Sequence, residues 1–295
     1  KEKLNVDMYA LNSRVNDLYF GILLLDEQLK QNVLLQDELE RNYRQITAYV
    51  ENGIANQADL DAVKVEQLNT KQKRVELVSS RMAYLKMLSL LVGEKLSQET
   101  VLEKPVPQDD ISAVGEIRRP ELSLFNAQGV GLQVQEKALN VRHLPQFGLF
   151  VQGAYGNPGL NMLKNEFSPY YIAGVRLSWN FGSLYTLKND RKVIENKRRQ
   201  LDNNRDVFLF NTRLEMTQQD QAIQSLEKQM QDDDEIIRLR TNIRKSAEAK
   251  VANGTLTVTE MLRELTNESL ARQSKALHEI QRLMGIYQLK YTTND

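Results

Sequence analysis

Apolar residues over the first fifty positions recur at alternating steps of three and four. They are Met8, Leu11, Val15, Leu18, Ile22, Leu25 and Leu29, followed in the same register by Leu39, Tyr43, Ile46 and Val50, with Asn32 and Gln36 at two intervening positions. A heptad register of about six repeats is typical of a helix that lies nearly parallel to its partners. At about 1.5 Å per residue this helix would span about 70 Å, which is more than a compact domain requires.

A second long helix is predicted from about residue 57 to 92. Asn52 and Gly53 end the first helix, because both residue types accept the left-handed conformation of a helix end, and Gly93 ends the second. Two long helices joined by a short loop lie antiparallel. Residues 1–93 are therefore predicted to form a helical hairpin.

The next stretch, residues 94–117, contains prolines and a glycine and no sustained periodicity, which indicates an irregular connection. A third helix is predicted within residues 118–145. It begins at Pro120, because the missing N–H of proline does no harm in the first turn of a helix.

Residues 146–181 show a period of two. Two segments of about ten residues, beginning at Phe147 and at Tyr171, alternate apolar and polar side chains and are joined by a polar loop. Transmembrane strands have about 9–11 residues, an apolar face toward lipid, a polar face toward a lumen and aromatic residues near the interfaces. The lumen-facing residues would be Gln152, Arg176, Ser178 and Asn180, and the interface aromatics Tyr155, Tyr171, Trp179 and Phe181.

Each of these assignments has a simpler alternative. The pair of strands could be an ordinary hairpin on a soluble core, although the long flanking helices leave no such core nearby. Arg176 could be a solvated surface residue.

Residues 182–295 are predicted to form a second helical hairpin that repeats the first. Asn253-Gly254 matches Asn52-Gly53, and an acidic residue follows each loop glycine at the same distance, Asp59 in the first hairpin and Glu260 in the second. The match predicts that both hairpins end at one tip, where these acids would line an opening. The alternative is that they are first-turn acids favoured by the helix dipole. The acidic run of residues 232–235 is interpreted as a solvated helix face.

Composition argues against nucleic-acid binding and catalysis. Lysine plus arginine equals aspartate plus glutamate at 39 each, so no overall field attracts nucleic acid. The chain has no cysteine, which excludes disulfides and thiolate chemistry. His143 and His278 lack evident partners and metal-ligand spacing, and Gly129-Val130-Gly131 follows no strand. We expect no catalytic residues, no cofactor and no metal. No run approaches the ~20 apolar residues of a membrane helix.

The order of these elements resembles the TolC-like outer-membrane efflux protein family. The matching stretches are residues 52–93, Arg119-Pro120-Glu121-Leu122, and residues 145–155, 174–182 and 253–289. The resemblance implies a mainly α protomer of a homotrimer, with strands in a shared outer-membrane β-barrel of a Gram-negative bacterium. It also implies a periplasmic helical tunnel with an irregular equatorial zone at residues 94–117. Such a tunnel docks a periplasmic adaptor (membrane fusion) protein and an inner-membrane pump, and conducts exported substrates passively.

Two departures from the family carry their own expectations. The family's initial helix and first pair of strands would precede Lys1, so three copies of this chain supply six strands, fewer than the ~8 of the smallest membrane barrels. We therefore expect that the chain alone does not close a normal barrel. The tyrosine and arginine that lock the family's tip correspond to Val251 and Leu256 here. Glu260 matches an acidic ring position, so Glu260→Ala is expected to weaken cation preference.

The rival interpretation is a soluble helical scaffold or periplasmic adaptor that binds partner helices. Adaptors combine long hairpins with domains of many strands, whereas this chain has one pair of strands. Detergent dependence would distinguish the two classes. An enzyme is a more distant third.

Overall fold

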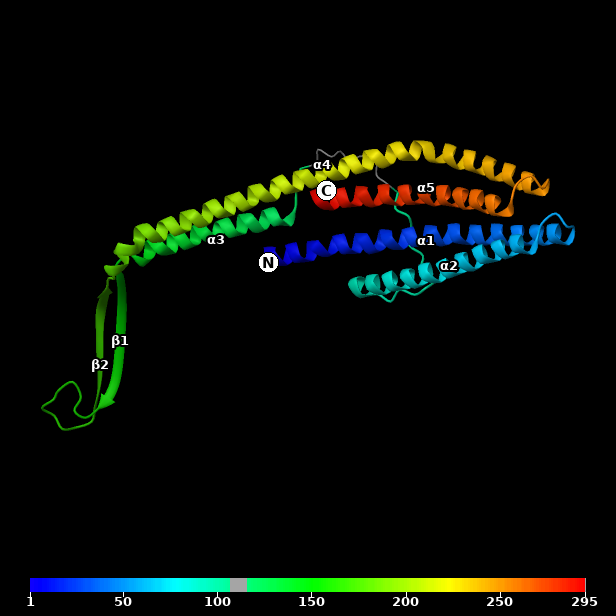
Figure 1. Cartoon of the computed structure of the whole chain (residues 1–295). Coiled ribbons are helices and arrows are strands. Elements are labelled where there is room, and N and C mark those ends of the chain that lie inside the picture. Colours follow the sequence, from blue (N-terminus) through cyan, green and yellow to red (C-terminus); the bar gives the residue numbers. More distant parts are fainter. Residues whose placement is uncertain (107–115, 295) are drawn as a thin grey trace. The chain divides into compact units, whose positions relative to one another are not determined.

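The computed structural model describes residues 1–106 and 116–294. Its elements in chain order are α1 (Glu2–Glu51), α2 (Gln57–Val92), α3 (Pro120–Arg142), β1 (Gln146–Gly156), β2 (Ser168–Ser178), α4 (Gly182–Ala252) and α5 (Val258–Thr293) (Figure 1). The expected fold class, long helices with one β-hairpin, is confirmed. Within the irregular connection expected at residues 94–117, positions 107–115 lie outside the described residues, and the rest contains no helix or strand.

The chain divides into two compact units. The first combines Lys3–Pro120 with Leu209–Asp295 and so contains α1, α2, the later part of α4, and α5. The second, Glu121–Phe208, contains α3, the β-hairpin and the beginning of α4. Helix α4 therefore contributes to both.

Helices α1 and α2 of the first unit pack along the heptad seam. Leu18 and Ile22 of α1 form a buried cluster with Leu85 and Leu88 of α2. Asn32, one of the polar seam positions, is buried, and its side-chain amide donates a hydrogen bond to the Thr70 carbonyl at 3.1 Å. A single buried polar pair at a seam fixes the register of two helices at some cost in stability.

Two hairpins meet at one tip of this unit. A single buried cluster contains Leu39, Ile46 and Val63 from the first hairpin, with Val251, Val258, Met261 and Leu265 among its members from the second. Figure 1 shows the α1–α2 and α4–α5 loops at the same end of the unit. The tip is thus a four-helix structure held by apolar packing.

The segment of residues 94–106, here called the strap, crosses the first unit. Arg81 of α2 donates hydrogen bonds to the carbonyls of Gln98 and Thr100, each at 2.7 Å. The Tyr19 hydroxyl donates to the Glu103 carbonyl, and Lys104 forms an ion pair with Glu279 of α5 at 2.6 Å. The strap therefore ties α1, α2 and α5 together.

In the second unit, α3 packs against the beginning of α4. The rings of Phe125 and Phe208 lie 5.8 Å apart. Glu136 forms an ion pair with Arg198 at 2.9 Å, and Asn140 accepts a hydrogen bond from Arg191 at 2.8 Å. This helix pair carries the β-hairpin at one end.

Candidate functional site

Strands β1 and β2 form an antiparallel hairpin whose register sorts its side chains onto two faces. Directly paired residues share a face. One face carries, pair by pair, Phe147 with Leu177, Leu149 with Val175, Val151 with Ala173, Gly153 with Tyr171, and Tyr155 with Pro169. This set is called the apolar face below. It contains no charged or amide side chain.

The apolar face has no cover from the described part of the chain. Leu149 is 86% exposed, Val151 78% and Val175 68%. Soluble monomers rarely expose contiguous apolar surface of this kind, and when they do it marks a contact with another protein or a membrane. The hairpin is therefore built to face an apolar environment that lies outside this chain.

The opposite face is mixed and carries three of the predicted lumen residues. Gln152, Arg176 and Ser178 lie on it together, paired with Ile172, Gly148 and Gln146. The Arg176 guanidinium stacks on the Phe150 ring, 5.4 Å from its centroid. A Cβ on Gly174 would lie 2.9 Å from that ring, so only glycine leaves enough space for the ring at this position.

The second strand ends earlier than the sequence pattern predicts. It was expected to continue to Phe181 but stops at Ser178, because Ser178 pairs with Gln146, the first residue of β1. Asn180, predicted to face the lumen, therefore lies outside the strand. So do Trp179 and Phe181, whose rings lie 4.3 Å apart. The Trp179 indole N–H donates to the His143 carbonyl at 3.2 Å and so fastens the hairpin to the end of α3.

Aromatic residues lie at both ends of the hairpin. Trp179 and Phe181 mark the end next to the helices. At the loop end, Tyr155 stacks on Phe167 with 5.7 Å between ring centroids, and Tyr171 is close by in the register. Aromatic residues at both edges of an apolar band are typical of strands that cross a membrane.

The two tip loops are the same structure built twice. Gly53 and Gly254 have φ of +74° and +68°. The Asn52 side chain donates to the Ala48 carbonyl at 2.7 Å, and that of Asn253 donates to Ala249 at 2.9 Å. The internal repeat seen in the sequence therefore extends to individual hydrogen bonds.

The predicted tip acids both take part in capping boxes. Asp59 accepts a hydrogen bond from the Asn56 backbone N–H at 3.0 Å, and Glu260 accepts one from that of Thr257 at 3.2 Å. The Asn56 and Thr257 side chains in turn accept from the backbone N–H groups of Asp59 and Glu260. Hydrogen bonds from Thr257 lower the pKa of Glu260, so this exposed carboxylate is ionised at neutral pH. Each acid thus has a structural role, and Glu260 adds a negative charge at the tip.

The two positions that depart from the family's tip lock are apolar here and pack inward. Val251 is 4% exposed and belongs to the tip cluster, and Leu256 packs against the same cluster. Nearby, Arg244 of α4 forms ion pairs with Glu268 of α5 at 2.5 Å and Glu38 of α1 at 3.9 Å. Apolar packing and this half-buried arginine hold the hairpins together.

Two expectations about charged residues are wrong. His278 was expected to have no evident partner, but its Nδ1 lies 2.9 Å from Oδ2 of Asp233. The acidic run at residues 232–235 was interpreted as a solvated face, yet Asp233 is 4% exposed. A helix turns 100° per residue, so one member of the run points toward α5 while its neighbours point outward.

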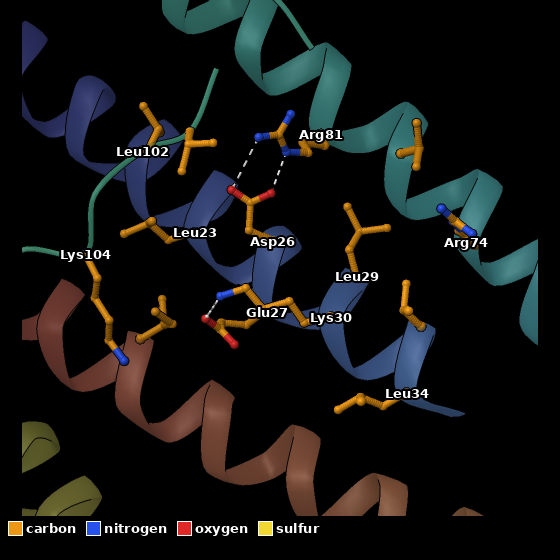
Figure 2. A pocket seen from close by; sticks show the side chains of 14 residues that line it. Leu23, Asp26, Glu27, Leu29, Lys30, Leu34, Arg74, Arg81, Leu102 and Lys104 are labelled. Carbon is orange, nitrogen blue, oxygen red and sulfur yellow. Dashed lines mark hydrogen bonds and ion pairs between the residues drawn. The ribbon is translucent and has the colours of Figure 1, made fainter. Parts of the chain in front are cut away.

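An open groove of about 790 Å³ lies beside the strap in the first unit (Figure 2). Leu23, Leu29, Leu34 and Leu102 supply apolar walls. Among its charged residues, Asp26 pairs with Arg81 and Glu27 with Lys30, as Figure 2 shows. The other two, Arg74 and Lys104, bind Gln36 and Glu279. The groove is a product of helix packing under the strap, and we assign no ligand to it.

Residues 1–106 and 116–294 contain neither an apolar helix long enough to cross a bilayer nor a cluster of metal ligands.

Comparison with known proteins gives structural matches alone. No protein-family model and no curated protein sequence matches the chain. Solved structures with the same fold include the transmembrane channel CusC (TM-score 0.79, 16% identity), outer membrane protein VceC from Vibrio cholerae (0.77, 13%) and the CmeC outer membrane channel from Campylobacter jejuni (0.74, 14%). Each covers 99% of this chain, which spans 70%, 70% and 66% of theirs. At these identities the likeness establishes the fold.

Proposed function

We propose that this chain, which has the fold of the TolC-like outer-membrane efflux proteins, is a protomer of a homotrimeric channel in the outer membrane of a Gram-negative bacterium. In this proposal β1 and β2 join a shared membrane barrel, and the long helices form a periplasmic tunnel. An adaptor protein and an inner-membrane pump deliver the substrates. The channel conducts them passively, without a catalytic residue or cofactor.

The observation that carries the proposal is the uncovered apolar face of the hairpin. Each Å² of apolar surface left in water costs about 25 cal/mol, and the described residues provide nothing that covers this face. Lipid chains would cover it, while the face with Gln152 and Arg176 would meet water. Aromatic residues at both ends of the hairpin support the same orientation.

Neighbouring residues on opposite faces provide a direct test. Val151 lies on the apolar face near the middle of β1, and Gln152 lies on the other. An arginine facing lipid near the midplane costs about 2–4 kcal/mol, whereas lumen substitutions leave insertion intact. In protein expressed from its complete coding sequence, Val151→Arg should strongly reduce the fraction recovered in outer membranes. Gln152→Arg should leave that fraction unchanged.

Two results would count against the channel. One is equal tolerance of both arginines. The other is a protein that stays monomeric and stable in buffer without detergent, which would favour the soluble scaffold or adaptor instead.

We further propose that Glu260, with Asp59, forms a ring of negative charge at the periplasmic entrance. The capping box accepts Glu or Gln at this position, so Glu260→Gln removes the charge and keeps the cap, whereas Glu260→Ala removes both. In planar bilayers, Glu260→Gln should lower the preference for cations over anions with little change in thermal stability. If the selectivity of that variant is unchanged, Glu260 does not contribute to ion preference at the entrance and acts only as a helix cap.

A further inference from the structure

The loop that joins β1 to β2, residues 157–167, presents a turn with two apolar residues at its centre. The Lys164 backbone N–H donates a hydrogen bond to the Asn161 carbonyl at 3.2 Å, which closes a β-turn around Met162 and Leu163. These two side chains are 88% and 96% exposed. Glycine, proline, asparagine, aspartate and serine dominate turns of this kind. Met162 and Leu163, called the loop tip below, depart from that pattern.

The amide side chains of the loop bond within the loop itself. Oδ1 of Asn161 accepts a hydrogen bond from the Leu163 backbone N–H at 3.1 Å. The Asn157 side-chain amide donates to Oδ1 of Asn165, also at 3.1 Å. In lipid, polar groups must find their partners inside the protein, because no water is there to bind them. The loop therefore combines internally bonded amides with apolar side chains that project outward, the reverse of what a water-facing loop requires.

The loop continues the apolar face of the hairpin. Phe167, its last residue, is 65% exposed and stacks on Tyr155, which belongs to the apolar face. Leu160, which precedes the loop tip in the chain, is 63% exposed. Exposed apolar residues thus extend from the apolar face, through this aromatic pair, into the loop. One apolar environment can cover all of them, which favours a lipid surface over a separate partner protein.

The length of the strands places the loop at the edge of a membrane. Figure 1 shows the loop at the end of the hairpin away from α3 and the beginning of α4. Each strand has 11 residues. At about 3.4 Å per residue and a tilt of about 40°, such a strand crosses about 28 Å of membrane, close to the apolar band of about 25 Å in a barrel. The loop therefore starts where the acyl chains meet the headgroups.

We propose that the loop tip inserts into the headgroup boundary of the membrane leaflet farther from the helices, so that Met162 and Leu163 contact lipid acyl chains. The proposal rests on the channel proposed above and adds a lipid contact beyond the strands. Apolar groups at a membrane interface lie about 5–10 Å into this boundary. Lys164 follows the tip, is exposed and forms no ion pair with any described residue. Its aliphatic stem lets the ammonium group reach lipid phosphates while the tip lies deeper.

A fluorescent label on a single cysteine measures where the loop tip lies. Leu163→Cys is introduced into protein expressed from the complete coding sequence without any other cysteine, labelled with bimane and reconstituted into phosphatidylcholine vesicles. Lipids that carry a nitroxide near the headgroup should quench this label about threefold more than a label at Glu166→Cys, because only the tip enters the boundary. Glu166 is an exposed polar residue of the same loop. Aqueous iodide should quench the two labels in the reverse order.

A charge at the loop tip provides an independent measurement. With the label at Met162→Cys, Leu163→Glu should lower the quenching by nitroxide lipids about threefold, because an ionised carboxylate resists transfer out of water. Glu166→Gln, which changes a charge in the same loop away from the tip, is the matched control and should leave the quenching unchanged.

A label at Val151→Cys, on the apolar face, separates this proposal from the channel itself. If lipids with a nitroxide deep in the acyl chain quench Val151→Cys, but iodide reaches Leu163→Cys as readily as Glu166→Cys, the loop tip faces water and only the loop contact is wrong. Protection of Leu163→Cys from both quenchers would show that another copy or a different protein covers the tip, which also overturns the lipid contact. Absence of lipid quenching at both Val151→Cys and Leu163→Cys would remove both proposals.

Discussion

At the residue scale, the tip loops depend on two glycines in a conformation that other residues avoid. Gly53 and Gly254 have positive φ, and a Cβ at either position would meet no atom within 4 Å. The cost of substitution is therefore backbone strain alone, about 1 kcal/mol for a left-handed residue. Gly53→Ala and Gly254→Ala should each lower the free energy of unfolding by that amount.

Urea unfolding followed by circular dichroism would measure this loss. Gly131→Ala, within helix α3 and with open space around its Cα, is the control, because alanine favours a helix interior over glycine. A loss for Gly131→Ala equal to that at the tips would show that the effect is not specific to the loops.

The buried carboxylate of Glu268 makes the helix packing near the tip sensitive to acid. Burial alone would raise the pKa of Glu268, but hydrogen bonds from Arg272, Arg244 and Thr241 lower it below its ordinary value. A carboxyl with a lowered pKa stabilises the fold above the pKa of the unfolded chain. That stability is lost as the pH falls through the lower, folded value. Unfolding should therefore become easier below about pH 4.5, near the ordinary pKa of a glutamate.

The measurement is the urea midpoint between pH 7 and pH 3, compared with Glu268→Gln. The variant should be less stable at pH 7 and should lose less stability on acidification. Parallel pH profiles for the two proteins would contradict the assignment.

At the element scale, the strap depends on one buried side chain. Arg81 is 8% exposed, holds two strap carbonyls and forms an ion pair with Asp26 at 2.5 Å. Arg81→Met would leave these acceptors without their donor. We expect a loss of about 2–3 kcal/mol, less than the full cost of breaking a buried pair, because Asp26 keeps some contact with water.

Limited proteolysis reports this effect locally. Cleavage within residues 94–106 should accelerate in Arg81→Met while the helices stay intact. Lys73→Met, which removes an exposed ion pair with Glu76 on the same helix, should change neither proteolysis nor stability by a measurable amount. Equal effects of the two substitutions would mean that the strap is held by other contacts.

At the scale of the whole molecule, the β-hairpin belongs to a different compact unit from the tip and its buried clusters. In the first unit these clusters lie around the tip and along both helical hairpins. Gln146 and Ser178 pair directly, so a short Gly-Ser linker can replace everything between them. Without its apolar face, the protein should stay in solution without detergent and keep its helical circular dichroism and thermal transition.

The behaviour of the linker variant shows whether the helices fold independently of the hairpin. Aggregation or loss of the thermal transition in the linker variant would show that the hairpin contributes to the fold of the helices. A continued need for detergent would show that another surface, such as the exposed Val65, Leu68 and Val75 of α2, is the main apolar exposure.

The sequence by itself determined the helices, the two strands, the repeated tip loops and which strand positions are apolar or polar. Heptad spacing, period-two alternation and Asn-Gly stops are properties of neighbouring residues. They predicted that Gln152 and Arg176 belong to polar positions of alternating strands, and the register places them on one face.

Tertiary structure decided what depends on residues far apart in the chain. The end of β2 at Ser178 is set by where β1 begins, which the alternation around Trp179 does not record. Asp233 is buried because His278, on another helix, lies against it. Val251, on the second hairpin, is buried in a cluster that includes Leu39, Ile46 and Val63 of the first hairpin. In each case the deciding contact joins segments that lie far apart in the chain, and a local sequence pattern does not record such a contact.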